Sequence, residues 1–268
     1  MRRSRFAAYV TSLLLAVGLA LTGAAAAQAS PLAATGGYVA LGDSYSSGVG
    51  AGSYIGSSGS CNRSTNAYPY LWQAAHAPAS FSFLACSGAK TTDVLSNQLG
   101  TLNSSTSLVS LTIGGNDAGF SDVMTTCVLQ SDSACLSRIA TAKAYVDTTL
   151  PGQLDAVYSA IRTKAPSAHV VVLGYPRFYK LGSSCVGLSE TKRSAINGAA
   201  DHIDAAIAKR AADHGFTYGD VRTTFSGHEI CSGNSWLHSL DWLNIGQSYH
   251  PTAAGQSGGY LPVMNGAA

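Results

Sequence analysis

Three short stretches of this 268-residue chain hold residues suited to nucleophilic chemistry. Ser44 lies in the stretch GDSYSSG at 42–48, directly after the apolar run 38–41. A strand that stops in a turn of small residues exposes a hydroxyl at a strand-to-helix corner, where a nucleophile can meet its substrate. The alternative is structural, because Asp and Ser at such a place also cap helices. Ser44 is therefore a candidate nucleophile whose activation requires further groups.

His250 is the candidate general base for that hydroxyl. A serine attacks an ester when a base takes its proton and donors stabilise the oxyanion that develops. Pro251 fixes the turn directly after His250, and Thr252 can start a terminal helix. A lone histidine before a proline also has a structural interpretation, so His250 alone does not decide the chemistry.

Asn116, in the turn GGND at 114–117, can offer a side-chain amide to the oxyanion. The preceding glycines allow the backbone to approach a substrate closely. The backbone amides of Gly88 and Ser44 are candidates for two further donors. The structural alternative is an ordinary Asn-Asp turn at the end of a strand.

Alternating strands and helices must position these turns. Apolar runs predict strands at 38–41, 81–84, 108–113, 169–174 and 216–218. Helices are predicted from 68–72 onward and at 92–99. A helical pattern runs from 137 to about 164 and is interrupted at Pro151-Gly152. A further helix is predicted from a cap at Ser189 to Gly215. This alternation predicts a parallel sheet in a three-layer α/β/α arrangement with right-handed crossovers. The turns that hold Ser44, Gly88 and Asn116 are then expected to gather at the carboxyl ends of the strands, where ligands bind in such folds.

Two long segments are predicted to be loops at the surface. The Gly- and Ser-rich stretch 51–66 is one, and 219–249, which lacks a clear period, is the other. Tyr54-Ile55 and the loop 219–249 are candidates for lining an acyl groove, although apolar loop residues more often pack on their own domain.

The first 29 residues have the pattern of a secretory signal peptide. Basic residues precede an apolar run from Phe6 to Leu21, and an Ala-x-Ala site ends at Ala29. We expect one domain over 30–268, secreted to the extracellular space, because no other stretch approaches the roughly 20 apolar residues of a membrane helix. Without the three arginines of the leader, the 16 basic and 14 acidic residues become 13 and 14, a formal charge near −1. Such a balance gives no electrostatic reason to expect a nucleic acid or an anionic membrane as main partner.

An exported chain with an even number of cysteines is expected to form disulfides. The six cysteines permit fifteen pairings, and sequence alone cannot choose among them. Pairing between sequence neighbours is our expectation: Cys61–Cys86, Cys127–Cys135 and Cys185–Cys231. Neither Cys-x-x-Cys nor any other metal-ligand spacing occurs, so we expect no metal and no cofactor.

Taken in order, these blocks resemble the SGNH (GDSL) hydrolase family. GDS at 42–44, Gly88, GGND at 114–117 and HPT at 250–252 match its four ordered blocks. The six cysteines and the runs GYPRFY at 174–179 and NIG at 244–246 are similar to secreted actinobacterial lipases of that family. The resemblance implies a flavodoxin-like α/β/α fold with a central parallel five-stranded sheet and the three neighbour disulfides. It also implies Ser44 as nucleophile, His250 as base, and an oxyanion hole of the Ser44 amide, the Gly88 amide and the Asn116 side chain.

One position departs from the family pattern. Many members carry an acidic residue three positions before the histidine, and here that position is Gln247. The resemblance then implies a Ser-His dyad whose imidazole is oriented by a backbone carbonyl near Gln247 or Ser248. Asp241 is the nearest upstream carboxylate, but nothing in the sequence brings it to the ring. Asp43 is expected to brace its turn rather than face the nucleophile.

The sequence therefore predicts a secreted serine ester hydrolase that acts on lipids through an acyl-enzyme intermediate. Triacylglycerol lipase or esterase activity is expected, with phospholipase A activity as a further option. One alternative is an acetylesterase that acts on polysaccharide. Another is a non-catalytic secreted binding protein, against which the joint presence of Ser44, Asn116 and His250 argues. The expected partner is a lipid or another acyl ester, with no stable membrane insertion, and the protein is expected to be a monomer.

Overall fold

Five parallel strands form the central sheet of the computed structural model, which describes residues 36–268. The predicted leader at 1–29 lies outside the described residues. The strands are β1 (Gly37–Gly42), β2 (Ser80–Phe83), β3 (Thr106–Thr112), β4 (His169–Leu173) and β5 (Thr217–Gly219), in the spatial order β2-β1-β3-β4-β5. This flavodoxin-like order confirms the predicted fold class.

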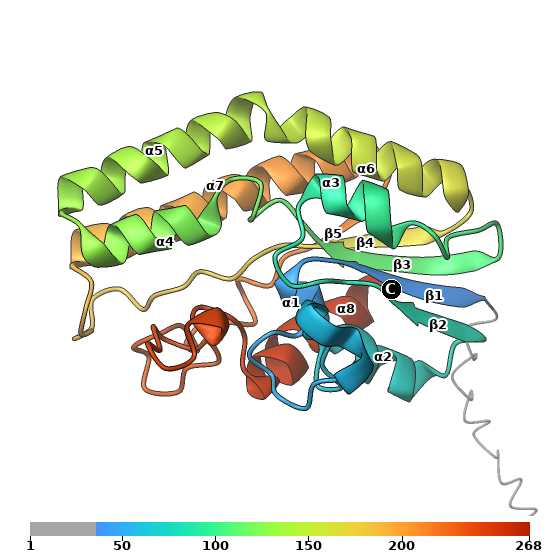
Figure 1. Ribbon diagram of the computed structural model, residues 1–268, viewed down its shortest axis with the longest axis horizontal. Coiled ribbons are helices and arrows are strands. Elements are labelled where there is room, and N and C mark those ends of the chain that lie inside the picture. The colour runs from blue at the N-terminus through green and yellow to red at the C-terminus, as the bar shows by residue number, and fades with distance from the viewer. Residues whose placement is uncertain (1–35) are drawn as a thin grey trace, which may run out of the picture. The chain divides into compact units, whose positions relative to one another are not determined.

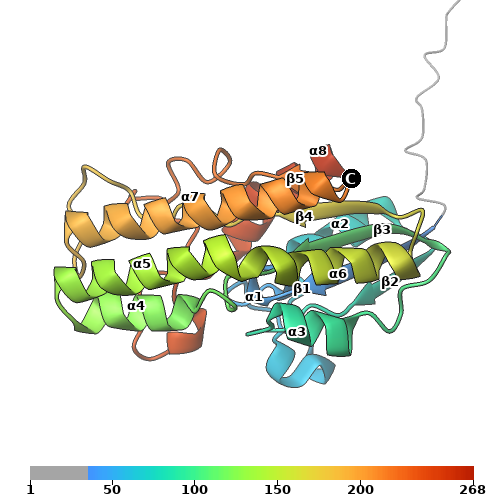
Figure 2. The same cartoon turned by 90° about the horizontal axis from the view of Figure 1, so that it is seen from above.

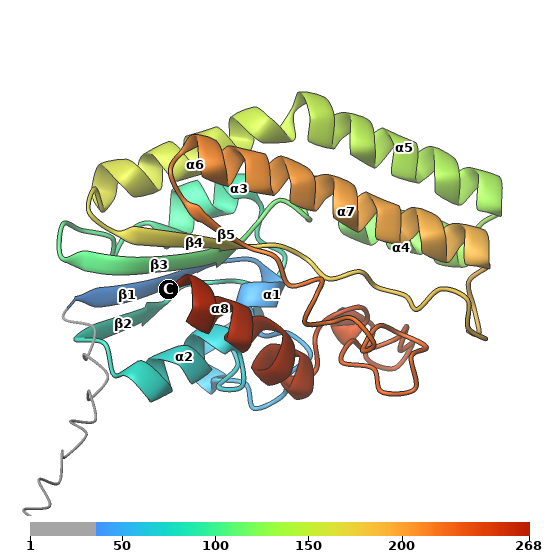
Figure 3. The same cartoon turned by 180° about the vertical axis from the view of Figure 1, so that it is seen from behind.

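Helices cover both faces of the sheet (Figures 1 and 3). On one face lie α3 (Thr91–Asp93) with the π-helical turn η2 (Val94–Gln98), α6 (Leu150–Lys164) and α7 (Glu190–Asp213). On the other face lie α2 (Tyr68–His76) and α8 (Leu261–Ala267), which continues the π-helical segment η4 (Gly255–Tyr260). Both faces of the middle strands are therefore buried, which is why β4 reads as the uninterrupted apolar run VVVL.

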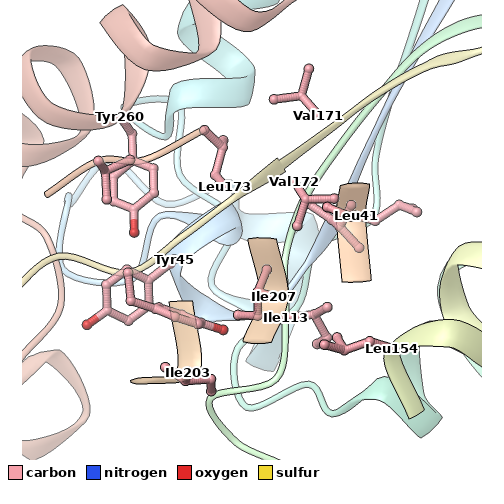
Figure 4. Close-up of a cluster of buried hydrophobic side chains, with 14 of the residues drawn as sticks. Leu41, Tyr45, Ile113, Leu154, Val171, Val172, Leu173, Ile203, Ile207 and Tyr260 are labelled. Atoms are coloured by element: carbon pink, nitrogen blue, oxygen red, sulfur yellow. The ribbon is translucent and has the colours of Figure 1, made fainter. Parts of the chain in front are cut away.

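The core joins these layers through large apolar side chains. Figure 4 shows Leu154 of α6 and Ile207 of α7 gathered with Ile113, which follows β3, and Tyr260 beside Leu173 of β4. All five side chains are completely buried.

Two helices extend beyond the carboxyl edge of the sheet (Figures 1 and 2). They are α4 (Phe120–Leu129) and α5 (Asp132–Thr148), and the disulfide Cys127–Cys135 ties one to the other. The sequence did not predict α4, because its Ser- and Thr-containing stretch follows a Gly-rich turn without a clear capping signal. Together with the start of α7, these helices add a wall next to the strand ends.

The helix break expected at Pro151-Gly152 lies slightly earlier. Thr149 separates α5 from α6, and Pro151 occupies the first turn of α6. A proline is tolerated there because the N–H that it lacks would have no partner within the helix. The start of α5 is also earlier than expected, since the Ser131 side chain accepts the N–H of Ala134 and caps the helix.

The expected boundaries of α7 are confirmed. The Ser189 side chain accepts the N–H of Lys192 at its start, and Gly215, with φ of 66°, follows its end.

The remaining two disulfides tie loops to the framework. Cys61–Cys86 joins the 3₁₀ turn η1 (Gly56–Cys61) to the segment after β2, and Cys185–Cys231 joins the segment before α7 to the loop 219–249. The three pairs are those expected from the sequence. No helix among residues 36–268 has both the length and the apolar character needed to span a membrane.

Candidate active site

Ser44 begins the one-turn helix α1 (Ser44–Ser47), directly after β1. Gly42 has φ of 119°, and a Cβ there would lie 2.4 Å from the Thr112 carbonyl oxygen, so only glycine lets the two strand ends approach so closely. Asp43 Oδ1 accepts the N–H of Tyr45 at 3.0 Å and the hydroxyl of Thr112 at 2.6 Å. As predicted, the Asp43 carboxylate braces this turn.

The side chain of His250 meets that of Ser44 across the mouth of the site. Nε2 of His250 lies 2.7 Å from Oγ of Ser44, although 206 positions separate the two residues. Nδ1 of His250 lies 3.1 Å from the backbone oxygen of Ser248. Because a carbonyl oxygen only accepts, Nδ1 carries the proton in the neutral ring and Nε2 accepts the Ser44 hydroxyl. This arrangement is suited to removing the Ser44 proton.

Backbone groups orient the imidazole, and position 247 holds a glutamine rather than an acidic residue. The backbone oxygen of Gln247 accepts the main-chain N–H of His250 at 3.1 Å, whereas the backbone oxygen of Ser248 accepts from the imidazole ring. The carboxylate of Asp241 is bonded instead to the N–H of Leu243 and the side chain of Asn244. The site is therefore a Ser-His pair in its geometry.

Burial keeps the imidazole neutral. It lowers the pKa of His250 from its ordinary value to about 4, because the charged ring loses its hydration. Hydrogen bonds to the carbonyls of Ser248 and Gln247 act in the opposite direction but do not compensate, and nearby His238 lowers the pKa further. At neutral pH the ring is thus available as a proton acceptor.

Three candidate oxyanion donors belong to Ser44, Gly88 and Asn116, which line the same cavity. The Asn116 side-chain amide donates one hydrogen bond to the Ala89 carbonyl at 3.0 Å, which orients the amide and leaves its second N–H for a ligand. Within residues 36–268, the backbone N–H groups of Ser44 and Gly88 donate no hydrogen bond. Such free donors beside a nucleophile are suited to an oxyanion.

A hydrogen-bonded contact ties two of these turns together. Asp117 accepts both the N–H and the hydroxyl of Thr91, at 3.1 and 2.6 Å. Since Thr91 follows the Gly88 turn, this contact sets the spacing between Gly88 and Asn116.

Tyr175 is a contributor that sequence reasoning missed. Its hydroxyl donates to Asp43 Oδ2 at 2.5 Å and accepts the N–H of Gly115 at 3.1 Å. The sequence did contain a signal for it. Tyr175 is a polar aromatic residue two positions after the strongly apolar strand β4, and it therefore lies at the same carboxyl edge of the sheet as Ser44.

An apolar cavity of about 460 Å³ opens at Ser44, His250 and Asn116. Its walls come mainly from α4, α5 and α7, through Val123, Met124, Val128, Val146, Ile196 and Ile203. Trp242 and Ile245 of the loop 219–249 also line it, in agreement with one sequence-based expectation. Tyr54 and Ile55 do not line it, so the expectation for that pair is wrong, and α4 supplies the wall instead.

Comparison with known proteins identifies the family of the chain. The model of the GDSL-like Lipase/Acylhydrolase family matches residues 40–257. The chain belongs to this family. It is therefore a carboxylic ester hydrolase, as its sequence predicted.

Relatives are similar over their full length. Lipase 1 of Streptomyces coelicolor is 74% identical over 268 residues, which is 100% of both chains. The crystal structure of phospholipase A1 from Streptomyces albidoflavus is 71% identical with a TM-score of 0.87, covering 88% of this chain and 100% of that one. The extracellular lipase of Streptomyces rimosus is 68% identical with a TM-score of 0.85, covering 87% and 100%.

Within the described part of the chain, no group of three or more His, Cys, Asp and Glu side chains could hold a metal ion.

Proposed function

We propose that this ester hydrolase cleaves the acyl esters of lipids, with Ser44 as nucleophile and His250 as general base. The observation that carries the proposal is the 2.7 Å contact between their side chains at the mouth of an apolar cavity. The relatives named lipase and phospholipase A1 support a lipid substrate.

In the first half-reaction, Ser44 Oγ attacks the acyl carbonyl as its proton passes to Nε2 of His250. The imidazolium that forms keeps its Nδ1–H on the Ser248 carbonyl. The negative charge on the carbonyl oxygen is taken up by the amides of Ser44 and Gly88 and the Asn116 side chain. His250 then protonates the departing alcohol, leaving an acyl-enzyme.

In the second half-reaction, His250 takes a proton from water, which attacks the acyl-enzyme. The same donors stabilise the second oxyanion, and the collapse returns the proton to Ser44 Oγ and releases the fatty acid. One base and one set of donors therefore serve both steps.

The cavity supports long acyl chains rather than acetate. An acetyl group would contact only the polar mouth, whereas the side chains of Val123, Val128 and Ile203 provide an apolar wall beyond it. Burial of each methylene contributes about 0.8 kcal/mol, so a medium or long chain gains affinity that an acetyl group lacks. An acetylesterase of polysaccharide has no comparable support.

We further propose that the enzyme is exported as a single domain over 30–268, after removal of residues 1–29, and acts as a monomer. The three disulfides and the extracellular relative support export.

The test is hydrolysis of p-nitrophenyl esters from acetate to palmitate by the mature enzyme and by Ser44→Ala. Activity should peak at medium or long chains and disappear in Ser44→Ala. Ala199→Phe, which places a ring in the cavity wall, should lower the ratio of palmitate to acetate hydrolysis. Undiminished activity of Ser44→Ala would refute the proposed nucleophile, and a peak at acetate would favour the acetylesterase. Hydrolysis rates on emulsified triacylglycerol and on dispersed phosphatidylcholine then show which of the two lipid classes the enzyme prefers.

A further inference from the structure

The loop beside the cavity mouth presents three large apolar side chains to solvent. Trp242 is 67% exposed, Leu243 is 93% exposed and Ile245 is 59% exposed. Trp242 and Ile245 also line the cavity, whereas Leu243 does not. We call these three residues the rim triad. An apolar surface that continues into a substrate cavity indicates contact with a partner.

Hydrogen bonds hold the rim triad in this exposed position. Asp241 Oδ1 accepts the N–H of Leu243 at 2.9 Å, and Asp241 Oδ2 accepts from the Asn244 side chain at 3.1 Å. The backbone N–H of Asp241 donates to the hydroxyl of Ser248, a buried residue, at 2.9 Å. The same residue, Ser248, accepts from the ring of His250. The rim triad is thus anchored to the segment that carries the candidate base.

The charge of the segment that carries the rim triad favours a neutral partner surface, although Lys143 lines the same cavity from α5. Between Ser239 and Tyr249 the only charged side chain is the carboxylate of Asp241, with no lysine or arginine. A segment that bound anionic headgroups by attraction would carry several cations. The contact therefore depends on apolar side chains, for which tryptophan at a water–lipid boundary is well suited.

We propose that the rim triad inserts into the surface of a lipid aggregate and holds the cavity mouth against it. This rests on the proposed function, because it identifies the physical form of the substrate as lipid in a bilayer or droplet. A protein partner or a second copy seated on the same residues would cover the entrance to the cavity. A lipid surface delivers substrate to the entrance instead.

The binding test uses the Ser44→Ala variant, so that lipid is not consumed. Its three tryptophans differ in exposure, since Trp72 is buried, Trp236 is half-buried and Trp242 is exposed. Phosphatidylcholine vesicles should shift tryptophan emission to the blue, and Trp242→Phe in the same background should abolish the shift. Leu243→Ser should weaken co-sedimentation with the vesicles about tenfold, because it removes one inserted leucine. The control Leu95→Ser, at an exposed leucine outside the cavity lining, should leave binding unchanged.

The activity test uses the same substitution with Ser44 intact. Leu243→Ser should keep the wild-type rate on soluble p-nitrophenyl acetate and lose about tenfold on sub-saturating vesicles. Equal losses on both substrates, or equal losses of vesicle binding in Leu95→Ser, would overturn the proposal. Binding that requires anionic lipid and disappears in salt would also overturn it. A dimer that forms without lipid and that Leu243→Ser dissociates would overturn it as well.

The two proposals fail in different ways. Vesicle binding by Ser44→Ala without lipid hydrolysis by the wild type would retain the insertion and reject the lipid substrate. Hydrolysis of vesicles by the wild type, together with unchanged vesicle binding in Leu243→Ser, would retain the lipid substrate and reject the insertion.

Discussion

The hydroxyl of Tyr175 lies 2.5 Å from Oδ2 of Asp43, across 132 positions of the chain. The same hydroxyl accepts the N–H of Gly115, next to Asn116. One buried phenol thus connects the turn of the candidate nucleophile with the turn of a candidate oxyanion donor. Their relative position depends on this hydrogen-bond chain.

Replacement of Tyr175 by Phe removes both bonds and should lower kcat about tenfold with little change in KM. Loss of a hydrogen bond to a charged group costs about 1.5–3 kcal/mol, part of which appears as misplacement of Asn116 and Ser44. Steady-state kinetics on a soluble ester measure the effect. Tyr38→Phe is the matched control, since it removes a buried bond to Ser110 in the core and should leave kcat unchanged. The same kcat in Tyr175→Phe and Tyr38→Phe would refute the positioning role.

Replacement of Asn116 by Ala should lower kcat about 100- to 1,000-fold, because one oxyanion donor contributes roughly 3–4 kcal/mol in the transition state. KM should change little, since the ground-state carbonyl gains less from the donor than the oxyanion does. Asn103→Ala, in a turn before β3 away from Ser44, is the control and should keep the wild-type kcat. A decrease below tenfold in Asn116→Ala would exclude the amide from the oxyanion hole.

The acid limb of kcat/KM should reflect the lowered pKa of His250. Only the neutral ring accepts a proton, so protonation of His250 should halve the activity near pH 4. His238→Gln should move this half-point upward, because His238 contributes to the low pKa. Values of kcat/KM on a soluble ester between pH 3.5 and 8 give the half-point of the wild type and that of His238→Gln, and circular dichroism verifies that both proteins stay folded. A half-point near 6.5 that His238→Gln does not move would contradict the assignment.

Asp43 should make the folded state less stable as pH rises. Burial raises the pKa of Asp43 to about 6, and the hydrogen bonds from Thr112, Tyr175 and Tyr45 lower it only in part. Since the unfolded value is lower, the protonated carboxyl favours folding below about pH 4, and this contribution is lost as pH rises through 6. The free energy of unfolding of Asp43→Asn minus that of the wild type should therefore increase by about 2 kcal/mol between pH 4 and 8.

Urea unfolding at the two pH values measures this difference. The pKa of Asp204, raised to about 8 by burial, affects both proteins alike and cancels in the comparison. A difference that does not vary with pH would show that the Asp43 carboxylate is ionised as easily in the folded state as in the unfolded one.

The sequence by itself determined the strands and the turns at their carboxyl ends. Apolar runs such as VVVL in β4, followed by small polar turns, are local patterns, and all five strands lie within two residues of the predicted ranges. The order of motifs also identified the family, because Ser44, Gly88, Asn116 and His250 occur in blocks that can be recognised without a structure.

Only the tertiary structure decided what surrounds those residues. The bond of Tyr175 to Asp43, the 2.7 Å contact of the His250 ring with Ser44 and the cavity wall from α4 depend on how separate elements pack. Local patterns encode which residues become helix or strand, since hydrophobic period and turn chemistry act over a few positions. They do not encode the few-ångström placements that chain closure and core packing impose between residues more than a hundred positions apart.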